Sequence, residues 1–358
     1  MTRLKVAVVG CGHLGTIHAR LLAARNDVEL VGVVDPSPEA RQRVAEAHGC
    51  RPLPEPGDLV GVATAAVVAA PTGLHASIAV PLLEAGLDLL VEKPIAASVE
   101  DARAIVTTAR RYGRIVAVGH VERFNPAWKL AIEKVGRPVA IESARLAPFT
   151  FRSMDVGVVH DLMIHDIDLV LSLEPGRLEH IEAHGIVATG GHEDAVRARL
   201  VFSSGLIADL TASRISPTLR RTVSLWSSAG MVSVDFNAKT VEVIAPSADV
   251  GSGRFVAAAV PPEQRVALKD AFFESVLPRE TFAVPDANAI VSEHDDFLAA
   301  IRTRRAPLVS ASAGAAALEI ANRVIDTLTC TRLGESVQRP TVPLAHRGPP
   351  PVPRRKTG

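Results

Sequence analysis

The sequence lacks the features that mark several broad classes of protein. Its 358 residues carry 39 basic and 39 acidic side chains, so no net charge draws it toward nucleic acid or an anionic membrane surface. Its apolar runs, such as VATAAVVAA at 62–70, fall well short of the ~20 residues that a membrane span requires. We therefore expect a protein that binds no nucleic acid and enters no membrane.

Cysteine is also scarce. Cys11, Cys50 and Cys330 are widely separated and show no CxxC spacing, which argues against a disulfide framework and against a zinc site. The first residues, MTRLKVAVVG, pass directly into an apolar strand without the pattern of a cleaved secretory leader. We expect a cytoplasmic protein with no bound metal.

The length predicts more than one domain, because a single core rarely serves more than ~150–200 residues. The residue pattern changes near position 120. We predict a first domain over 1–120, a second over 121–345, and a disordered tail over 346–358, where HRGPPPVPRRKTG has no apolar period.

A glycine motif follows the first apolar run. Gly10, Gly12 and Gly15 form G-x-G-x-x-G between a strand pattern and a helical pattern. In a dinucleotide-binding unit these glycines allow a tight turn, close approach of pyrophosphate, and helix packing on the strand. We predict that this loop, including His13 and Leu14, binds the cofactor phosphates at a helix N-terminus.

An acidic residue ends the second strand pattern, VELVGVVD. Asp35 lies 20 residues after Gly15, where a carboxylate would bind both ribose hydroxyls and repel a 2′-phosphate. NAD is therefore favoured, although the nearby Ser37 and Arg41 leave NADP open.

Further buried strands are predicted at 65–71, 87–94 and 114–120, each after a helical stretch. This alternation predicts a doubly wound parallel sheet, in which ligands bind at the carboxyl ends of the strands. The cofactor-binding candidates at these ends are Pro71, Thr72, His75, Glu92 and Lys93, with Pro94 and His120 beside them. Lys93 could donate to a substrate oxygen, or it could be a surface lysine paired with Glu92.

The second half alternates with period two, at 138–146, 195–215, 220–236 and 240–245. This pattern is typical of an open, mainly antiparallel sheet in an α+β domain. Two helical patterns within 290–330 are expected to pack back on the first domain.

The stretch HDLMIHDIDLVLSL at 160–173 is apolar on most sides. As a single α-helix it would carry Asp161, His165 and Asp168 in one polar stripe. The stripe is either a satisfied internal network, including a simple Asp161–His165 helix pair, or the lining of a site. A metal site of His160, Asp161 and His165 is disfavoured, because His160 would point elsewhere on the helix.

Four motifs together resemble the glucose-fructose oxidoreductase, inositol dehydrogenase and rhizopine catabolism family of NAD(P)-dependent sugar oxidoreductases. They are VVGCGHLGTIHA, VAAPTGLHAS, VEKPIAAS and HDLMIHDID, and the resemblance runs from Leu4 to Leu333. It implies that Lys93 and His165 flank the carbon that loses hydride and that Asp161 orients the imidazole. The family's glycine between Asp161 and His165 is Met163 here, which is expected to reshape the pocket.

The stretch GHVERFNPA at 119–127 resembles the subgroup that oxidises the 3-hydroxyl of a nucleotide sugar such as UDP-N-acetylglucosamine. The resemblance implies a 3-keto product that an aminotransferase consumes on the route to lipid A. Arg123 and Asn125 are then the expected contacts to the diphosphate or N-acetyl group, and Arg214 and Arg221 are weaker candidates. The uncovered sheet face predicts a homodimer or homotetramer.

Two rival functions stay open at this point. Some relatives of this fold bind NAD and a sugar as regulators, but the presence of both Lys93 and His165 argues against that role. A dehydrogenase of free sugars or inositols is the other alternative.

Overall fold

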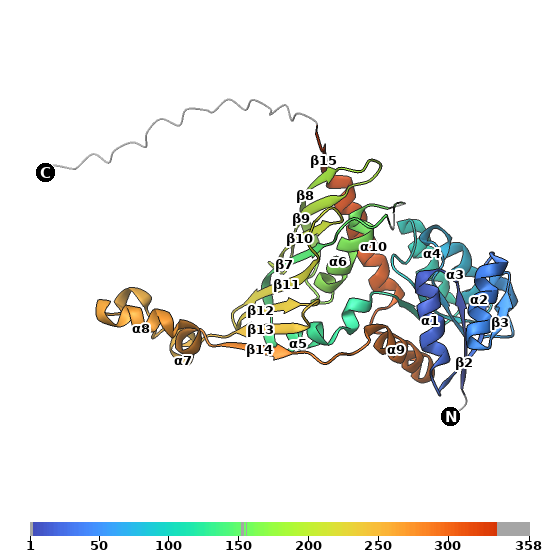
Figure 1. The fold of residues 1–358 in the computed structure, drawn as a ribbon, viewed down its shortest axis with the longest axis horizontal. Coiled ribbons are helices and arrows are strands. Elements are labelled where there is room, and N and C mark those ends of the chain that lie inside the picture. Colours follow the sequence, from blue (N-terminus) through green and yellow to red (C-terminus); the bar gives the residue numbers. More distant parts are fainter. Residues whose placement is uncertain (1–2, 152–153, 155, 335–358) are drawn as a thin grey trace.

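The computed structural model describes residues 3–151, 154 and 156–334, which form two β-sheets with helices packed around them (Figure 1). The predicted tail at 346–358 lies outside the described residues. Within the described part of the chain, no helix combines the length and the apolar character needed to cross a bilayer.

The first sheet has six parallel strands in the order β3-β2-β1-β4-β5-β6. The predicted doubly wound parallel sheet is thus confirmed, and its strand order reverses between β1 and β4, where such sheets bind ligands. The strands are β1 (Leu4–Val9), β2 (Val28–Val34), β3 (Arg51–Leu53), β4 (Ala65–Val68), β5 (Asp88–Val91) and β6 (Val116–Val118).

Helices cover both faces of this sheet, which is why its central strands are apolar at almost every position. One face packs against α1 (His13–Ala23), α2 (Pro38–His48) and α9 (Ala289–Thr303). The other packs against α3 (His75–Glu84), α4 (Val99–Arg111) and the first turns of α10 (Ala311–Thr327).

The second sheet has nine strands in the order β14-β13-β12-β11-β7-β10-β9-β8-β15. Its neighbours are antiparallel except for the pairs β7–β10 and β8–β15, so the predicted open, mainly antiparallel sheet is also confirmed. The strands are β7 (Pro138–Leu146), β8 (Leu178–Val187), β9 (Ala195–Phe202), β10 (Ile207–Ser213), β11 (Arg220–Ser227), β12 (Gly230–Asp235), β13 (Thr240–Ile244), β14 (Arg279–Ala283) and β15 (Thr329–Arg332).

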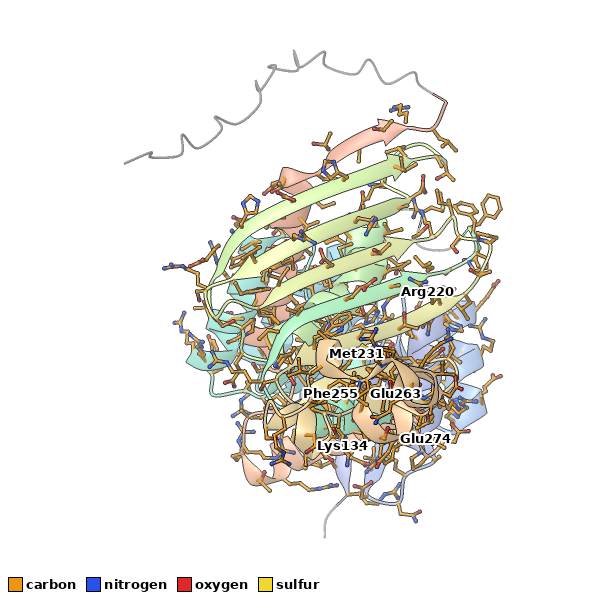
Figure 2. The ribbon with its side chains drawn as sticks, turned by 90° about the vertical axis from the view of Figure 1, so that its left-hand side faces the viewer. Lys134, Arg220, Met231, Phe255, Glu263 and Glu274 are labelled. Carbon is orange, nitrogen blue, oxygen red and sulfur yellow. The ribbon has the colours of Figure 1, made fainter. Side chains whose placement is uncertain are left out.

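One face of this sheet packs against α5 (Pro126–Val135), α6 (Ile164–Leu171) and α10. Figure 2 looks onto the other face, which we call the bare face: among the described helices, only those of the segment between β13 and β14 stand in front of it, over its lower strands. Helix α10 belongs to both cores: Leu318 packs under the first sheet, and Ala321 and Val324 pack under the second. The two C-terminal helices therefore return to the first half of the chain, α9 against α1 and α10 against α4 and β6.

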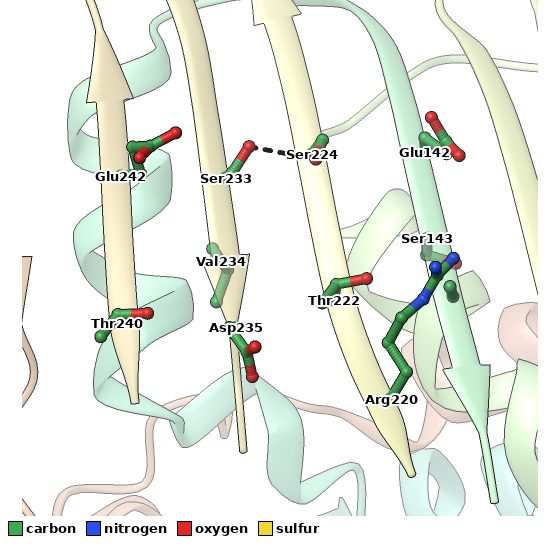
Figure 3. A pocket seen from close by; sticks show the side chains of 11 residues that line it. Glu142, Ser143, Arg220, Thr222, Ser224, Ser233, Val234, Asp235, Thr240 and Glu242 are labelled. Carbon is green, nitrogen blue, oxygen red and sulfur yellow. Dashed lines mark hydrogen bonds between the residues drawn. The ribbon is translucent and has the colours of Figure 1, made fainter. Parts of the chain in front are cut away.

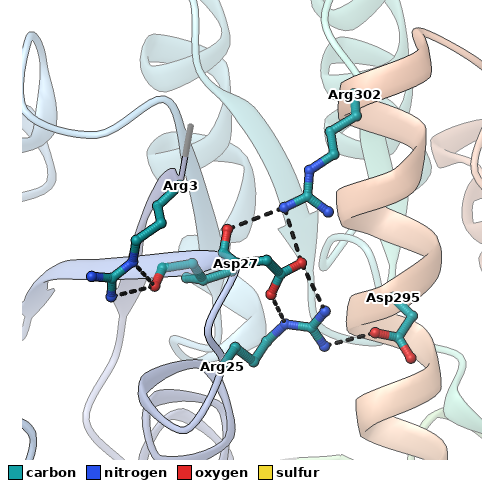
Figure 4. Close-up of polar contacts among 6 residues, drawn as sticks. Arg3, Arg25, Asp27, Asp295 and Arg302 are labelled. Atoms are coloured by element: carbon teal, nitrogen blue, oxygen red, sulfur yellow. Dashed lines mark hydrogen bonds and ion pairs between the residues drawn. The ribbon is translucent and has the colours of Figure 1, made fainter. Parts of the chain in front are cut away.

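Ion pairs hold α9 against the first sheet (Figure 4). Arg25 binds Asp27 at 2.9 Å and Asp295 of α9 at 2.7 Å, and Arg302 of α9 binds Asp27 at 2.9 Å. A single exposed pair contributes little, but this shared network fixes α9 relative to the start of β2.

Between β13 and β14 the chain leaves the sheet, and we call residues 246–278 the arm. It contains α7 (Ala248–Gly251), α8 (Arg265–Asp270) and short 3₁₀ and π turns, and it extends away from the bare face of the sheet (Figure 1). No described residue of the arm belongs to a hydrophobic core cluster, and Val256, Val266 and Phe273 are exposed.

Candidate active site

A cavity of about 460 Å³ lies at the carboxyl ends of β4, β5 and β6, and it is lined by both halves of the chain. Eight of the predicted site residues line it: Leu14, Pro71, Thr72, His75, Glu92, Lys93, Asp161 and His165. The crevice predicted at the carboxyl ends of the strands thus brings together predicted site residues up to 151 positions apart, Leu14 and His165.

The glycine loop stands beside this cavity. Gly10 has φ +97°, and a Cβ on Gly15 would lie 1.8 Å from the Gly10 carbonyl oxygen, so both positions require glycine. A Cβ on Gly12 would meet nothing within 4 Å. Gly12 begins α1 without a side-chain cap, and His13 lies next to it in an adjoining hollow. This open helix N-terminus fits a pyrophosphate.

Asp35 directly follows β2, beside that loop. Its carboxylate accepts hydrogen bonds from the backbone N–H groups of Cys11 (2.8 Å) and Ser37 (2.9 Å), which fix its orientation. The Arg41 guanidinium donates to the carbonyls of Asp35 and Pro36. The glycine loop and a fixed carboxylate together fit the pyrophosphate and ribose of NAD.

Lys93 follows β5 in a cis Lys93–Pro94 peptide. Its ammonium donates to the backbone carbonyl of Asp161 at 2.7 Å and to the Asp161 carboxylate at 3.3 Å. The alternative of a surface lysine paired with Glu92 is wrong, because the Glu92 carboxylate bonds the His18 ring and the Lys93 backbone N–H. Lys93 therefore joins the two halves of the chain across the cavity.

The stretch at 160–173 is not one regular α-helix. A π-helical turn, Val159–Met163, precedes α6, and it carries Asp161 while His165 lies in the first turn of α6. Such turns recur at functional sites because they re-aim side chains. Here Asp161 contacts Lys93, and the predicted bond from Asp161 to the imidazole is absent. Met163 points into the core of the second sheet, so it does not reshape the pocket as expected.

His165 lies in a low-dielectric, cationic setting. Burial lowers its pKa well below 6.5, and the charges of Lys93 and Arg145 lower it further. Its Nδ1 has no hydrogen-bond partner among the described residues. The ring of His120 lies edge-on to it, with centroids 6.3 Å apart, and burial lowers the pKa of His120 as well. At neutral pH His165 is thus an uncharged imidazole, which can accept a proton.

Arg123 and Asn125 lie outside the cavity lining. Arg123 holds the buried carboxylate of Asp168 through two hydrogen bonds of 2.7 and 3.1 Å. Asn125 caps α5 by accepting from the Ala127 N–H at 3.0 Å. Both side chains are thus committed to internal bonds, and Asp168 has a structural partner.

Three further residues shape the site, although the sequence indicated no role or only a weak one for them: Arg221, His160 and Glu193. Arg221, at the start of β11, lines the cavity, whereas Arg214 is paired with Asp194. His160 also lines it and bonds Asn322 at 2.7 Å. Glu193 accepts from the Val159 N–H at 3.1 Å and so holds the π-helical turn. The sequence signal for Arg221 was its position at the start of the strand pattern at 220–236.

Comparison with known families assigns both halves of the chain. Residues 4–120 match the oxidoreductase family with an NAD-binding Rossmann fold, and residues 130–233 match the C-terminal domain of the same glucose-fructose oxidoreductase, inositol dehydrogenase and rhizopine catabolism family. The chain belongs to this family. It is an NAD-dependent oxidoreductase.

Individual relatives agree with this assignment. The UDP-N-acetylglucosamine 3-dehydrogenase of Acidithiobacillus ferrooxidans is 31% identical over 89% of this chain and 97% of its own length. A crystal structure of that enzyme aligns with a TM-score of 0.81 at 30% identity, covering 92% of this chain and 98% of that one. The scyllo-inositol 2-dehydrogenase (NAD(+)) of Bacillus subtilis is 28% identical over 60% of this chain and 68% of its own.

Proposed function

We propose that the protein oxidises a secondary hydroxyl of a sugar, namely the 3-hydroxyl of UDP-N-acetylglucosamine, to the ketone. The observation that carries this proposal is the convergence of Lys93, Asp161 and His165 on one cavity beside a glycine loop that fits NAD. The full-length similarity to a UDP-N-acetylglucosamine 3-dehydrogenase supports the choice of substrate.

In the proposed mechanism, His165 accepts the proton of the sugar hydroxyl, since a neutral imidazole is available at working pH. Lys93 donates a hydrogen bond to the same oxygen and stabilises the developing alkoxide. Asp161 holds the Lys93 ammonium in place, through both its carbonyl and its carboxylate. Bound NAD supplies the hydride acceptor.

Arg221 is the side chain that we assign to the diphosphate of the substrate. It lies at the rim of the cavity, and its guanidinium offers a planar fork for phosphate oxygens. Arg123 and Asn125, which the sequence favoured for this contact, act indirectly by fixing Asp168 and α5.

A panel of substrates tests the proposal. The purified protein is incubated with NAD and with UDP-sugars, free hexoses or inositols, while the absorbance of the reduced nicotinamide is followed. Turnover of UDP-N-acetylglucosamine is expected. Turnover of an inositol with none of any UDP-sugar would instead establish the inositol dehydrogenase alternative, which the Bacillus subtilis relative represents.

Two substitutions test the residues. Lys93→Met and His165→Ala are expected to abolish hydride transfer and to leave NAD affinity, measured by calorimetry, unchanged. Full activity in either variant removes that residue from the mechanism. Calorimetry also compares the affinities of NAD and NADP. Because the Asp35 carboxylate would repel a 2′-phosphate, we expect NADP to bind more weakly than NAD.

We further propose a homodimer, or a homotetramer built from it, joined through the bare face of the second sheet. Strand register places six apolar residues side by side across this face, and we call them the apolar row: Ile244, Met231, Trp226, Ala140, Ile207 and Val201. Figure 3 shows the neighbouring row, which is polar and includes Glu242, Ser233, Ser224 and Glu142. An apolar stripe with a polar border is typical of a subunit interface.

Two further proposals concern the cellular compartment of the enzyme and its functional partner. A cytoplasmic enzyme fits the three free cysteines, Cys11, Cys50 and Cys330. The 3-keto product is a substrate for an aminotransferase, and we propose such an enzyme as the functional partner.

A further inference from the structure

A buried chain of hydrogen bonds links the nucleotide-binding helix to the end of β5. The Lys93 backbone N–H donates to Glu92 Oε2 at 3.1 Å, and Glu92 Oε1 lies 2.8 Å from Nε2 of His18 on α1. His18 Nδ1 in turn lies 2.8 Å from Nε2 of His294 on α9. Both histidines are at most 1% exposed, so this chain connects three distant segments inside the protein.

Glu92 fixes which atoms donate and which accept in this series of hydrogen bonds. Burial raises the pKa of Glu92, but the hydrogen bond and charge of His18, together with the charge and backbone N–H of Lys93, outweigh burial and leave that pKa lowered. Because an ionised carboxylate can only accept, His18 Nε2 must carry the hydrogen and donate it. Glu92 therefore holds one oxygen on His18 and the other on the Lys93 backbone.

Glu92 has no room to take another position. A Cβ placed on Gly119, which follows β6, would lie 2.8 Å from Glu92 Oε2 and 3.2 Å from its Cα. The Glu92 side chain is thus confined between β6 and α1, and its orientation depends on the donor that His18 provides.

Glu293 of α9 completes the cluster. Its carboxylate lies within 4.8 Å of the ligand atoms of His18 and Glu92, and its Oε1 has no partner among the described residues. Two buried carboxylates so close together require a shared proton or a cation. Both ring nitrogens of His18 are already in hydrogen bonds, which leaves no lone pair for a metal and favours a proton on Glu293.

We propose that His18 is a positioning residue for hydride transfer: its hydrogen bond to Glu92 fixes the backbone of Lys93 and so sets the reach of the Lys93 ammonium toward Asp161 and the substrate. This inference rests on the proposed function, in which Lys93 contacts the reacting oxygen. It also means that the helix that receives the cofactor phosphates is bonded directly to the turn that carries Lys93.

Two substitutions at the same site separate this role from simple structural support. In His18→Gln the amide can stand where Nε2 stood and still donate to Glu92, whereas in His18→Asn the amide stands where Nδ1 stood and loses Glu92. We expect kcat of His18→Asn to fall roughly tenfold to a hundredfold, with His18→Gln within about threefold of wild type, and KM and NAD affinity nearly unchanged in both. Equal kcat values in two folded variants would overturn the proposal.

A Glu92 variant and the wild-type protein test the same proposal without relying on the folding of the His18 variants. Glu92→Gln is isosteric but offers a single acceptor for two donors, so its kcat is expected to fall by a similar factor. In the wild-type protein without cofactor, ¹⁵N spectra should show His18 protonated at Nε2. A His18 resonance with unprotonated Nε2, or a stoichiometric metal found by elemental analysis, would contradict the arrangement.

The two proposals fail in different ways. If the wild-type protein turns over a sugar and Lys93→Met does not, the proposed function stands whatever the His18 variants do. If Lys93→Met is fully active, Lys93 has no role in the reaction, and the proposal that His18 positions it fails as well.

Discussion

At the scale of single residues, the glycine loop offers a matched pair of substitutions. Gly15→Ala places a Cβ 1.8 Å from the Gly10 carbonyl oxygen, so we expect the free energy of unfolding to fall by about 1–3 kcal/mol or more. Gly12→Ala meets no atom within 4 Å, so the protein should fold as wild type while the added methyl group blocks the phosphates. Thermal unfolding and calorimetric NAD titration measure the two effects. Wild-type NAD affinity in Gly12→Ala would show that the phosphates bind elsewhere.

The setting of His165 predicts how activity depends on pH. Burial and the charges of Lys93 and Arg145 keep its pKa well below 6.5, so the imidazole stays neutral as pH falls through 6.5. A base with a lowered pKa loses activity only when pH falls through that lowered value. We therefore expect titration of His165 to leave kcat/KM constant near neutrality and to lower it only below pH 6.5. A decline centred at or above 6.5 would show that His165 is charged in the free enzyme.

Residues that belong to a sequence motif could be located from the sequence. Residues whose role depends on a partner far away in the sequence were assigned wrongly. Lys93 was found from its place after a strand, Asp161 and His165 from their helical spacing, and the family resemblance supplied their roles. All three line the cavity. Arg123 was assigned to substrate because its partner, Asp168, lies 45 positions later and no local pattern links the two. Met163 was expected in the pocket because it replaces the family's glycine, and the one-helix interpretation could not show that the π-helical turn buries it in the core.

At the scale of elements, the π-helical turn depends on Glu193 from the segment before β9. Glu193 accepts from the Val159 N–H at 3.1 Å, and a Cβ on Gly157 would lie 1.9 Å from its Oε1. We expect Glu193→Ala to lose about 1–3 kcal/mol of unfolding free energy, because a buried donor is left without its acceptor. It should also lower kcat, since Asp161 lies on this turn.

Glu193→Gln is the control for that substitution, because its amide oxygen can still accept the same hydrogen bond. Urea unfolding and kcat together test the idea. A stable Glu193→Ala variant with wild-type kcat would show that the turn forms without this bond.

The strands were predictable where apolar residues form a continuous run or alternate with polar ones, and were missed where neither pattern is clear. The pattern at 138–146 gave the bounds of β7 correctly. Strand β8 was missed because a register shift between Leu178 and His180 breaks its period of two. Strands β14 and β15 are short edge strands whose side chains are mostly exposed, so burial leaves little pattern in them.

At the scale of the whole molecule, the apolar row predicts the state of association. Trp226→Glu places a charge in the middle of the row, and we expect it to convert the dimer or tetramer to single chains in sedimentation velocity. Val60→Glu is the control, since Val60 is 53% exposed on the first half of the chain. A wild-type protein that sediments as one chain at micromolar concentration would refute the interface.

The arm has a consequence for how the length of this chain can change. Its two ends are tied together at the neck, where the Ala245 N–H donates to the Pro278 carbonyl and the Ser247 N–H to the Val276 carbonyl, at 3.0 and 3.1 Å. Strands β13 and β14 pair directly below that neck, so the sheet is closed whatever lies beyond it. Codons gained or lost within the arm would leave both cores untouched. The arm is therefore where a change in length leaves the fold of the single chain intact, and where it acts instead on the face through which two chains are proposed to associate.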